Sequence, residues 1–223
     1  MAKVKKEQPV ILITNDDSIG APGIHALVKA VQGLGKIVVV APDKPQSGMG
    51  HAITLGQHLR LTKVHWEDDP TVEAYSCSGT PVDCVKLAVN EILKKKPDLC
   101  VSGVNHGSNS SINVIYSGTM SAAVEAGIEG IPAIGFSLLD YYWNADFEQI
   151  KPYIKKIALE VLAKKLSEGT VLNVNFPKLK FEEIKGIKIC RQAKAIWMEK
   201  FDKGQTPYGK DYYWLTGEFV NQD

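Results

Sequence analysis

A short apolar run that ends in two adjacent carboxylates is the feature that most constrains the fold of this chain. Residues 10–14 are apolar or β-branched throughout, which is typical of a strand buried on both faces in a parallel sheet. Asn15, Asp16 and Asp17 follow where this strand would end, and open α/β sheets bind ligands at such ends. Neighbouring carboxylates repel each other unless a cation lies beside them, so the run predicts a divalent metal site. A solvated turn is the alternative that this stretch alone leaves open.

Apolar strands and amphipathic helices alternate along most of the chain. Apolar side chains recur at helical spacing in residues 24–34, 81–93, 120–126 and 147–166. Buried strands are expected at residues 37–40, 98–102, 131–136 and 171–176, in addition to 10–14. Shorter strands at residues 52–55, 59–64 and 72–77 are expected to form a β excursion from the main sheet. This order predicts an α/β fold built from right-handed βαβ units.

The pattern changes after residue 176, so we predict a catalytic core at residues 1–176 and a β-rich appendage at residues 177–223. The appendage is rich in Lys, Tyr and Trp. Its aromatic side chains either form a subunit interface or fold back on the core, and both alternatives stay open. These side chains are Trp197, Tyr208, Tyr212, Tyr213 and Trp214.

Composition excludes several classes of function. The formal net charge of +1 gives no global field that would attract nucleic acid or a membrane surface. No apolar run approaches the length of a membrane span, and the charged N-terminal residues have no signal-peptide core behind them. The four cysteines form no C-x-x-C pair and are interpreted as free thiols. We therefore expect a cytoplasmic protein without nucleic-acid or membrane partners.

Small polar residues follow several of the predicted strands. They are Ser47 and Gly48, residues 103–107, and residues 116–119. Since the ends of neighbouring parallel strands meet at one edge, these loops are expected beside the two carboxylates. Carboxylate, hydroxyl and amide oxygens suit Mg²⁺, Mn²⁺ or Ca²⁺ better than Zn²⁺.

Two Ser-Gly-Thr turns, at residues 78–80 and 117–119, precede predicted helices. Backbone N–H groups of such turns bind anions, so each is a candidate phosphate cradle. Each turn alone is a weak signal, because a Ser or Thr N-cap beside a glycine is common. The common nucleotide-binding fingerprints G-x-x-x-x-G-K-[ST] and G-x-G-x-x-G are absent.

Five motifs in order carry a resemblance to a known family. They are ITNDD at residues 13–17, VAPDK at 40–44 with Ser47 behind it, SGTP at 78–81, VSGVNHG at 101–107 and YSGT at 116–119. Together they resemble the SurE family of stationary-phase survival proteins. The resemblance is dense over residues 10–136 and thinner beyond.

This resemblance implies a three-layer, mostly parallel, Rossmann-like sheet with one divalent cation, Mg²⁺ or Mn²⁺, per subunit. It implies a phosphatase that hydrolyses nucleoside 5′- and 3′-monophosphates to nucleoside and phosphate. It also implies a homodimer or homotetramer formed through the C-terminal appendage. The metal ligands implied by the matching motifs are Asp16, Asp17, Ser47 and Asn105, with Asp16 or Asp17 as the group that accepts a proton. The implied phosphate-binding residues are Ser47, Gly48, Asn105, Asn109, Ser117, Gly118 and Thr119.

The chain departs from the family pattern at two points. Ser18 stands where the family commonly has glycine, so a positive φ at this position would strain the backbone. Family members generally run further than Asp223, so either the sequence is truncated relative to them or further residues were left out of it, and both alternatives stay open. His51 and His106 lie beside the proposed site loops; their contact with the site is left open, and no acid–base role is assigned to them.

Two alternatives from other classes remain at this level. A receiver-like signalling domain also has an acidic pair after its first strand, and Asp43 would be its phosphoacceptor. Such a domain needs a lysine after a later strand, but residues 137–140 contain none, and the chain is about twice too long. A non-catalytic nucleotide-binding module is the second alternative.

Overall fold

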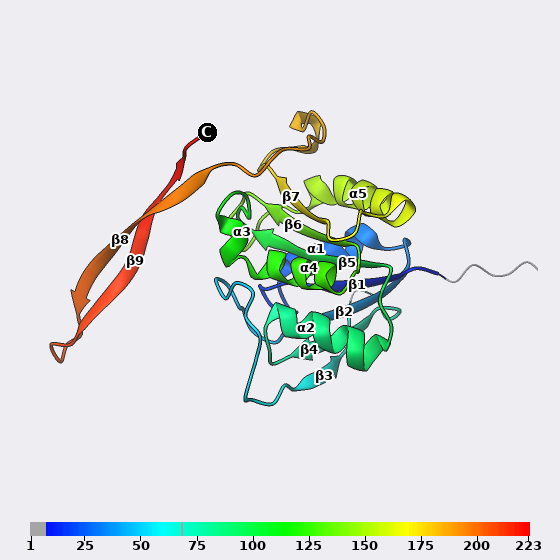
Figure 1. Cartoon of the computed structure of the whole chain (residues 1–223), viewed down its shortest axis with the longest axis horizontal. Helices are drawn as coiled ribbons and strands as arrows, with labels where there is room; N and C mark the ends of the chain where they lie inside the picture. Colours follow the sequence, from blue (N-terminus) through cyan, green and yellow to red (C-terminus); the bar gives the residue numbers. More distant parts are fainter. Residues whose placement is uncertain (1–7, 68) are drawn as a thin grey trace, which may run out of the picture.

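The chain folds around one seven-stranded sheet in the order β3-β4-β2-β1-β5-β6-β7 (Figure 1). The structure is a computed structural model, and it describes residues 8–67 and 69–223. All neighbouring strands of this sheet pair in parallel except β3, which is antiparallel to β4. The strands are β1 (Val10–Thr14), β2 (Lys36–Pro42), β3 (Leu61–Val64), β4 (Glu73–Cys77), β5 (Leu99–His106), β6 (Ala133–Leu138) and β7 (Val171–Phe176).

Helices cover both faces of the sheet, which gives three layers (Figure 1). Helices α1 (Pro22–Val31) and α5 (Lys151–Lys164) lie on one face, and α2 (Pro81–Leu87) and α4 (Gly118–Ile128) lie on the other. The alternation of β1 explains how both faces are buried. Ile11 and Ile13 join the core under α1, whereas Leu12 joins the core under α4. The α/β, mostly parallel fold is thus confirmed.

The predicted excursion at residues 52–55 is wrong as a strand, because this segment is irregular. The Thr54 backbone N–H and hydroxyl both donate to the Asp83 carboxylate, at 3.2 and 2.6 Å. The segment is therefore bound to the start of α2 by side-chain hydrogen bonds and does not extend the sheet.

The predicted loop at residues 103–107 is also wrong in part, because β5 continues through His106. After a register shift that begins at Ser102, β5 pairs again with β6, where Asn105 lies opposite Ser137 and His106 opposite Leu138. Asn105 and His106 are thus held by sheet hydrogen bonding, which fixes their side chains more firmly than a loop would.

Helix boundaries differ from the predicted ones at three places. The helix expected at residues 81–93 is α2 followed by a π-helical segment, Ala88–Leu93. Helix α4 begins at Gly118, two residues before the predicted start. The helix expected at residues 147–166 is a 3₁₀ turn, Glu148–Ile150, that leads into α5. A short helix, α3 (Asn113–Tyr116), was not expected.

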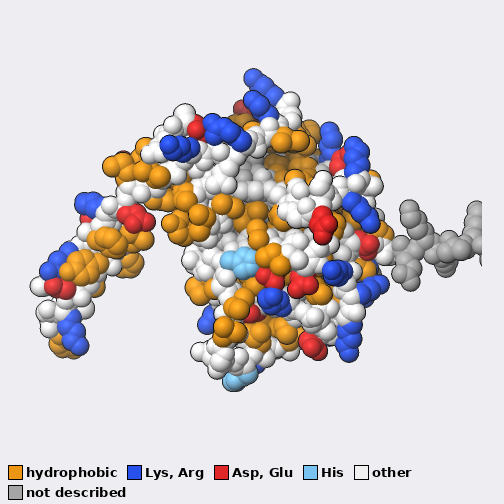
Figure 2. Space-filling view, viewed as in Figure 1, with side chains coloured by type: hydrophobic (Ala, Val, Ile, Leu, Met, Phe, Trp, Pro, Cys, Tyr) orange, Lys and Arg blue, Asp and Glu red, His pale blue; other side chains and the backbone are white. Residues whose placement is uncertain are grey.

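The C-terminal segment forms a long antiparallel hairpin, β8 (Ala195–Gln205) and β9 (Asp211–Asn221), that projects away from the sheet (Figures 1 and 2). Of the two alternatives left open for its aromatic side chains, folding back on the core does not occur within this chain, because these side chains are exposed. The base of the hairpin is fastened to the core, because the Trp197 indole donates to Asn113 Oδ1 at 2.8 Å. A subunit interface stays a prediction, as does the division into residues 1–176 and 177–223. Within residues 8–67 and 69–223, no helix has the length and apolar character needed to cross a membrane.

Candidate functional site

The ends of β1 and β5 and the start of α4 bring three predicted site residues together. The Thr119 hydroxyl donates a short hydrogen bond to Asp16 Oδ1. The same hydroxyl oxygen lies 3.4 Å from Asn105 Oδ1. A carboxylate, an amide oxygen and a hydroxyl from three separate elements therefore meet at the carboxyl edge of the sheet, as the resemblance implied.

Asp16 is a buried acid whose charge is poorly compensated. Burial raises the pKa of Asp16 to about 6, and the neighbouring charge of Asp17 adds to this rise; the hydrogen bond from Thr119 opposes it. Among residues 8–67 and 69–223, no Lys or Arg side chain forms an ion pair with either carboxylate. A bound cation would favour the ionised carboxylates and so offset both burial and the charge of Asp17, so this pair fits a metal ion.

Asp17 has one partner of its own, the imidazole of His106. His106 Nδ1 lies 3.0 Å from Asp17 Oδ2. This hydrogen bond raises the pKa of His106 above its usual value and outweighs burial, which lowers it. The ring is fixed edge-on against Phe147 and stacks on Trp143. The contact of His106 with the site was left open from sequence. The structure shows that His106 belongs to the site, because its imidazole contacts Asp17.

The N-terminus of α4 lies directly against Asp16. Ser117 caps the helix by accepting the Met120 N–H at 3.0 Å, as its place before the helix predicted. A Cβ atom at Gly118 would lie 2.6 Å from the Asp16 Cβ, so only glycine fits there. The Thr119 backbone N–H also lowers the pKa of Asp16. The helix start that was predicted to bind phosphate therefore also stabilises a carboxylate of the protein itself, that of Asp16. The sequence did not predict this contact.

The loop after β2 approaches the same edge through its backbone. The Gln46 N–H donates to the Asp16 carbonyl at 2.7 Å, and the Gly50 N–H donates to the Tyr116 carbonyl at 3.3 Å. Ser47 is exposed one residue further along, and Gly48 has a positive φ of 73°. Both residues are thus brought beside the carboxylates, and their roles as metal or phosphate ligands stay predictions.

Asn109 is buried but is fastened elsewhere. Its side-chain Nδ2 donates to Ser137 Oγ at 2.8 Å, and its backbone N–H donates to Asn175 Oδ1 at 2.9 Å. Asn173 Nδ2 donates to its carbonyl at 2.8 Å. These bonds order the loop after β5 against β6 and β7 and do not join Asn109 to Asp16. Its proposed place near the phosphate stays a prediction.

The other Ser-Gly-Thr turn is already occupied. Thr80 and Asp83 form a capping box at the start of α2, with hydrogen bonds of 3.2 and 2.9 Å. The Asp83 carboxylate thus takes the place that an anion would occupy at this helix N-terminus. Both helix N-termini therefore receive a protein carboxylate, but only the turn at residues 117–119 lies beside the predicted metal ligands Asp16 and Asn105, so it stays the candidate phosphate cradle.

Ser18, which stands where the family commonly has glycine, adopts a positive φ. Its φ is +89°, and the Asn15 side-chain N–H₂ donates to its carbonyl at 2.8 Å. The buried Asn15 amide therefore holds a strained turn directly after the carboxylate pair.

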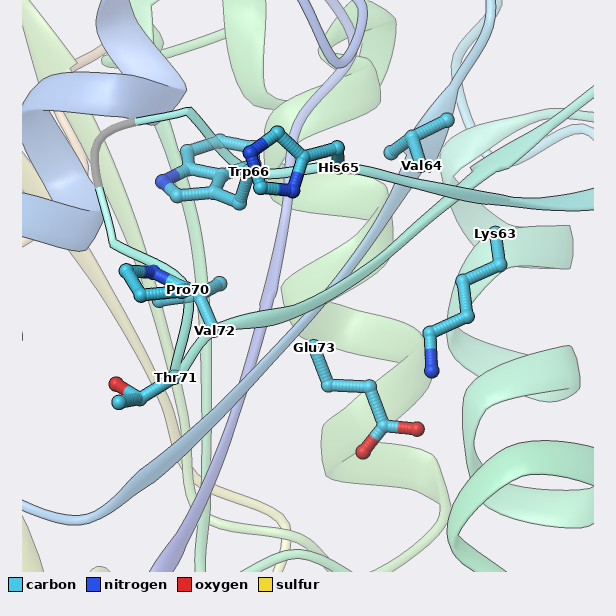
Figure 3. Close-up of a pocket in the computed structure, with 8 residues that line it drawn as sticks. All are labelled: Lys63, Val64, His65, Trp66, Pro70, Thr71, Val72 and Glu73. Atoms are coloured by element: carbon cyan, nitrogen blue, oxygen red, sulfur yellow. The ribbon is translucent and has the colours of Figure 1, made fainter.

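A hollow of about 590 Å³ lies away from this site, beside the start of β4 and the end of β3 (Figure 3). Trp66, Pro70 and Glu73 are among its lining residues (Figure 3). Glu73 is at the amino end of its strand, so the hollow is at the sheet edge opposite to Asp16. No predicted site residue lines it.

No group of three or more His, Cys, Asp and Glu side chains is placed to hold a metal within residues 8–67 and 69–223. The predicted metal shell is of another kind, since it combines two carboxylates with hydroxyl and amide oxygens. Such oxygen shells are typical of Mg²⁺ and Mn²⁺.

The fold and the site define an α/β protein with a buried carboxylate, a second carboxylate beside it and a glycine turn at the carboxyl edge of a mostly parallel sheet. The chain belongs to the SurE family, because the family model described as "Survival protein SurE" matches residues 11–199. This confirms the resemblance and gives no support to a receiver domain.

Named relatives and a solved structure agree with this assignment. The chain is 76% identical to "5′-nucleotidase SurE" of Flavobacterium psychrophilum, over 97% of this chain and 84% of that protein. It is 72% identical to "5′-nucleotidase SurE" of Flavobacterium johnsoniae, over 99% of this chain and 85% of the relative. It is similar to the crystal structure of the SurE protein from Aquifex aeolicus, with a TM-score of 0.81 and 44% identity, covering 94% of this chain and 83% of the other.

Proposed function

We propose that this protein is a 5′-nucleotidase that depends on a divalent metal and also accepts nucleoside 3′-monophosphates. The relatives named 5′-nucleotidase SurE support the nucleotidase activity. The observation that carries the metal dependence is the buried carboxylate of Asp16, which lies beside Asp17 without a Lys or Arg partner in the described residues. A buried carboxylate beside a second negative charge is costly unless a cation neutralises it.

Asp16, Asp17, Asn105 and Ser47 would hold the metal, Mg²⁺ or Mn²⁺. When bound, this ion would polarise the phosphoryl oxygens and lower the pKa of a water molecule. His106 orients the Asp17 carboxylate through the 3.0 Å hydrogen bond. That carboxylate can take up the proton of the attacking water, on the side of Asp17 that His106 leaves free.

The start of α4 supplies the anion-binding groups of the proposal. The Gly118 N–H belongs to the first turn of the helix and has no partner within the helix, as is usual for such positions. Together with the positive end of the helix dipole, it stabilises charge on the phosphoryl oxygens. The missing side chain at Gly118 lets this backbone lie close to Asp16, so metal and phosphate sites adjoin.

Phosphate release from nucleoside 5′- and 3′-monophosphates, with Mg²⁺, Mn²⁺ or a chelator, tests the proposal. Asp17→Asn is expected to lower kcat/KM by about 10²-fold or more while the unfolding midpoint stays close to that of the wild type. Asp43→Asn is the matched control, because Asp43 is an exposed carboxylate at the end of the neighbouring strand β2. Full activity of Asp17→Asn, or of protein stripped by the chelator, would show that the mechanism is wrong.

Phosphodonor labelling and nucleotide binding, measured beside phosphate release, separate the alternatives. A receiver-like domain would be labelled stably by a small phosphodonor, and Asp43→Asn would abolish the label. A non-catalytic module would bind nucleotides without releasing inorganic phosphate. Each result differs from the turnover that we expect.

We also propose a homodimer or homotetramer formed through the hairpin β8–β9. Exposed apolar side chains on both strands support this, since Phe201, Trp214 and Leu215 are all exposed in the single chain. Figure 2 shows hydrophobic side chains along the projecting hairpin. Light scattering at micromolar concentration tests it, and a monomeric mass would refute it. Cytoplasmic location belongs to the same proposal and is supported by free thiols at Cys77, Cys84 and Cys100.

A further inference from the structure

The loop that follows β6 carries large exposed aromatic side chains at the edge of the candidate site. Tyr141 is 74% exposed and Trp143 is 61% exposed. The loop begins after Leu138, which lies opposite His106 in the register of β5 and β6. It therefore leaves the sheet at the same edge as the carboxylates.

Trp143 is joined to the carboxylates through a single side chain. Its ring stacks on His106 with centroids 5.6 Å apart and an interplanar angle of 7°. His106 in turn lies 3.0 Å from Asp17. The indole is thus one imidazole ring away from the proposed metal site, and most of its surface faces solvent.

Tyr141 packs against Gly107, the residue that directly follows the end of β5. A Cβ atom at Gly107 would come within 2.3 Å of Tyr141 Cε1, so the ring packs directly on the glycine backbone. Gly107 also has a φ of +94°, which favours glycine for a second reason. It follows Asn105 by two residues, so the Tyr141 ring also borders the proposed site.

The loop is held in one conformation although its aromatic side chains are exposed. The buried Asp140 carboxylate forms a 3.0 Å ion pair with Lys178 and accepts the Tyr142 N–H at 3.2 Å. At the far end of the loop, Phe147 is buried and packs edge-on against His106. The rings of Tyr141 and Trp143 are therefore positioned before any ligand binds, which lowers the entropic cost of binding.

We propose that Tyr141 and Trp143 form a nucleobase platform, on which the base of the substrate stacks while its phosphate lies at Asp16, Asp17 and Gly118. The inference rests on the proposed nucleotidase function and names the part of the substrate that these rings recognise. A nucleoside monophosphate carries its phosphate and its planar base at opposite ends of one ribose. In the protein, the Trp143 ring stacks on His106, whose imidazole contacts Asp17, so an aromatic surface lies next to the proposed phosphate site.

Stacking on these rings predicts which substrates the protein prefers. Every base offers a π face, so an aromatic platform favours nucleotides over sugar phosphates but discriminates little between bases. The platform thus predicts similar kcat/KM values for adenosine and uridine 5′-monophosphates. It predicts a much lower value for ribose 5-phosphate, which has no base.

The test compares substrates with and without a base on the same preparations. Trp143→Ala is expected to lower kcat/KM for both nucleotides about tenfold or more, chiefly through KM, and to leave that for ribose 5-phosphate unchanged. Trp143→Phe is expected to keep most of the nucleotide activity, since it keeps a ring. Tyr142→Ala is the matched control, because Tyr142 is similarly exposed in the same loop, but one face of its ring contacts Lys178 Nζ, 4.9 Å from the ring centroid.

The ratio between substrates is independent of the fraction of variant that folds. An equal loss on nucleotides and ribose 5-phosphate would overturn the platform, because Trp143 would then act only by supporting His106. No loss on either would overturn it as well. Calorimetric titration with adenosine, the product nucleoside, adds a readout without turnover, because adenosine carries the base but has no phosphate to release. Wild-type protein that releases no phosphate from nucleotides refutes the proposed function, whereas undiminished binding of adenosine by Trp143→Ala refutes the platform.

Discussion

Gly118→Ala probes the closest contact between the start of α4 and the carboxylate pair. The added Cβ atom would lie 2.6 Å from the Asp16 Cβ and 2.9 Å from its Oδ2. Neither neighbour is free to give way. Asp16 follows a fully buried strand and is itself held by Thr119, while Gly118 begins a helix that is buried along most of its length.

Two effects of opposite sign set the change in stability. Overpacking a well-packed site costs about 1–3 kcal/mol. Replacing a helical glycine by alanine returns at most about 1 kcal/mol. The free energy of unfolding should therefore fall by roughly 1 kcal/mol, which lowers the melting temperature by about 2–4 °C in a chain of this size. Activity should fall further, because a displacement of about 1 Å at a catalytic group can cost 10²-fold.

Urea unfolding and phosphate release from a nucleoside 5′-monophosphate measure the two quantities. Gly20→Ala is the control, since Gly20 lies three residues after Asp17 and a Cβ there meets nothing within 4 Å. Wild-type kcat/KM and wild-type metal dependence in Gly118→Ala would refute the contact between α4 and Asp16, and the site built on it.

Two further predictions concern stability. Ser18→Gly should raise the free energy of unfolding by about 0.5–1 kcal/mol in urea, because it relieves a φ of +89°; an unchanged midpoint would contradict the strain. Glu125→Gln should lower it by about 1–2 kcal/mol at pH 7, because Glu125 is buried and pairs with Lys86 and with His51 at 2.8 Å. Burial raises the pKa of Glu125, but the hydrogen bonds from Lys86 and His51 outweigh it, so the net pKa is below the usual 4.5. The stabilising effect is complete above that value and is lost as the pH falls through the folded-state pKa, so wild type and variant should converge in acid.

Periodicity and strand ends predicted most of the architecture. The run at residues 10–14 became β1 without change, because an apolar run of strand length has few other ways to be buried. The predicted strand at residues 52–55 failed for the opposite reason. Its residues do not alternate clearly, and the hydrogen bonds of Thr54 to Asp83 come from a helix start 29 residues away. Side-chain contacts of that kind leave no local pattern in a sequence.

The sequence predicted which residues form the candidate site better than it predicted how these residues contact one another. Asp16, Asn105 and Thr119 were each placed at a strand or helix end, and the structure joins them. The role of His106 was left open, because its partner Asp17 is 89 residues away and only the parallel pairing of β1 with β5 brings them together. The signal that existed was a histidine directly after Asn105 at a strand end. The exposed aromatic side chains of residues 139–147 were a second such signal.

The two Ser-Gly-Thr turns show why the metal site required the structure. Each turn begins a helix, and each helix N-terminus receives a carboxylate. At residues 78–80 the carboxylate is Asp83, three residues further in the same helix, so the group is complete and local. At residues 117–119 it is Asp16, which comes from β1 and has a second carboxylate, Asp17, beside it. One helix N-terminus stabilises about half a unit of negative charge, so it can balance one buried carboxylate in part but not two. The turn at residues 117–119 thus has more negative charge beside it than its helix can balance, whereas the turn at residues 78–80 does not. This difference is the physical reason to expect a cation at residues 117–119 and none at residues 78–80, although both turns have the sequence Ser-Gly-Thr.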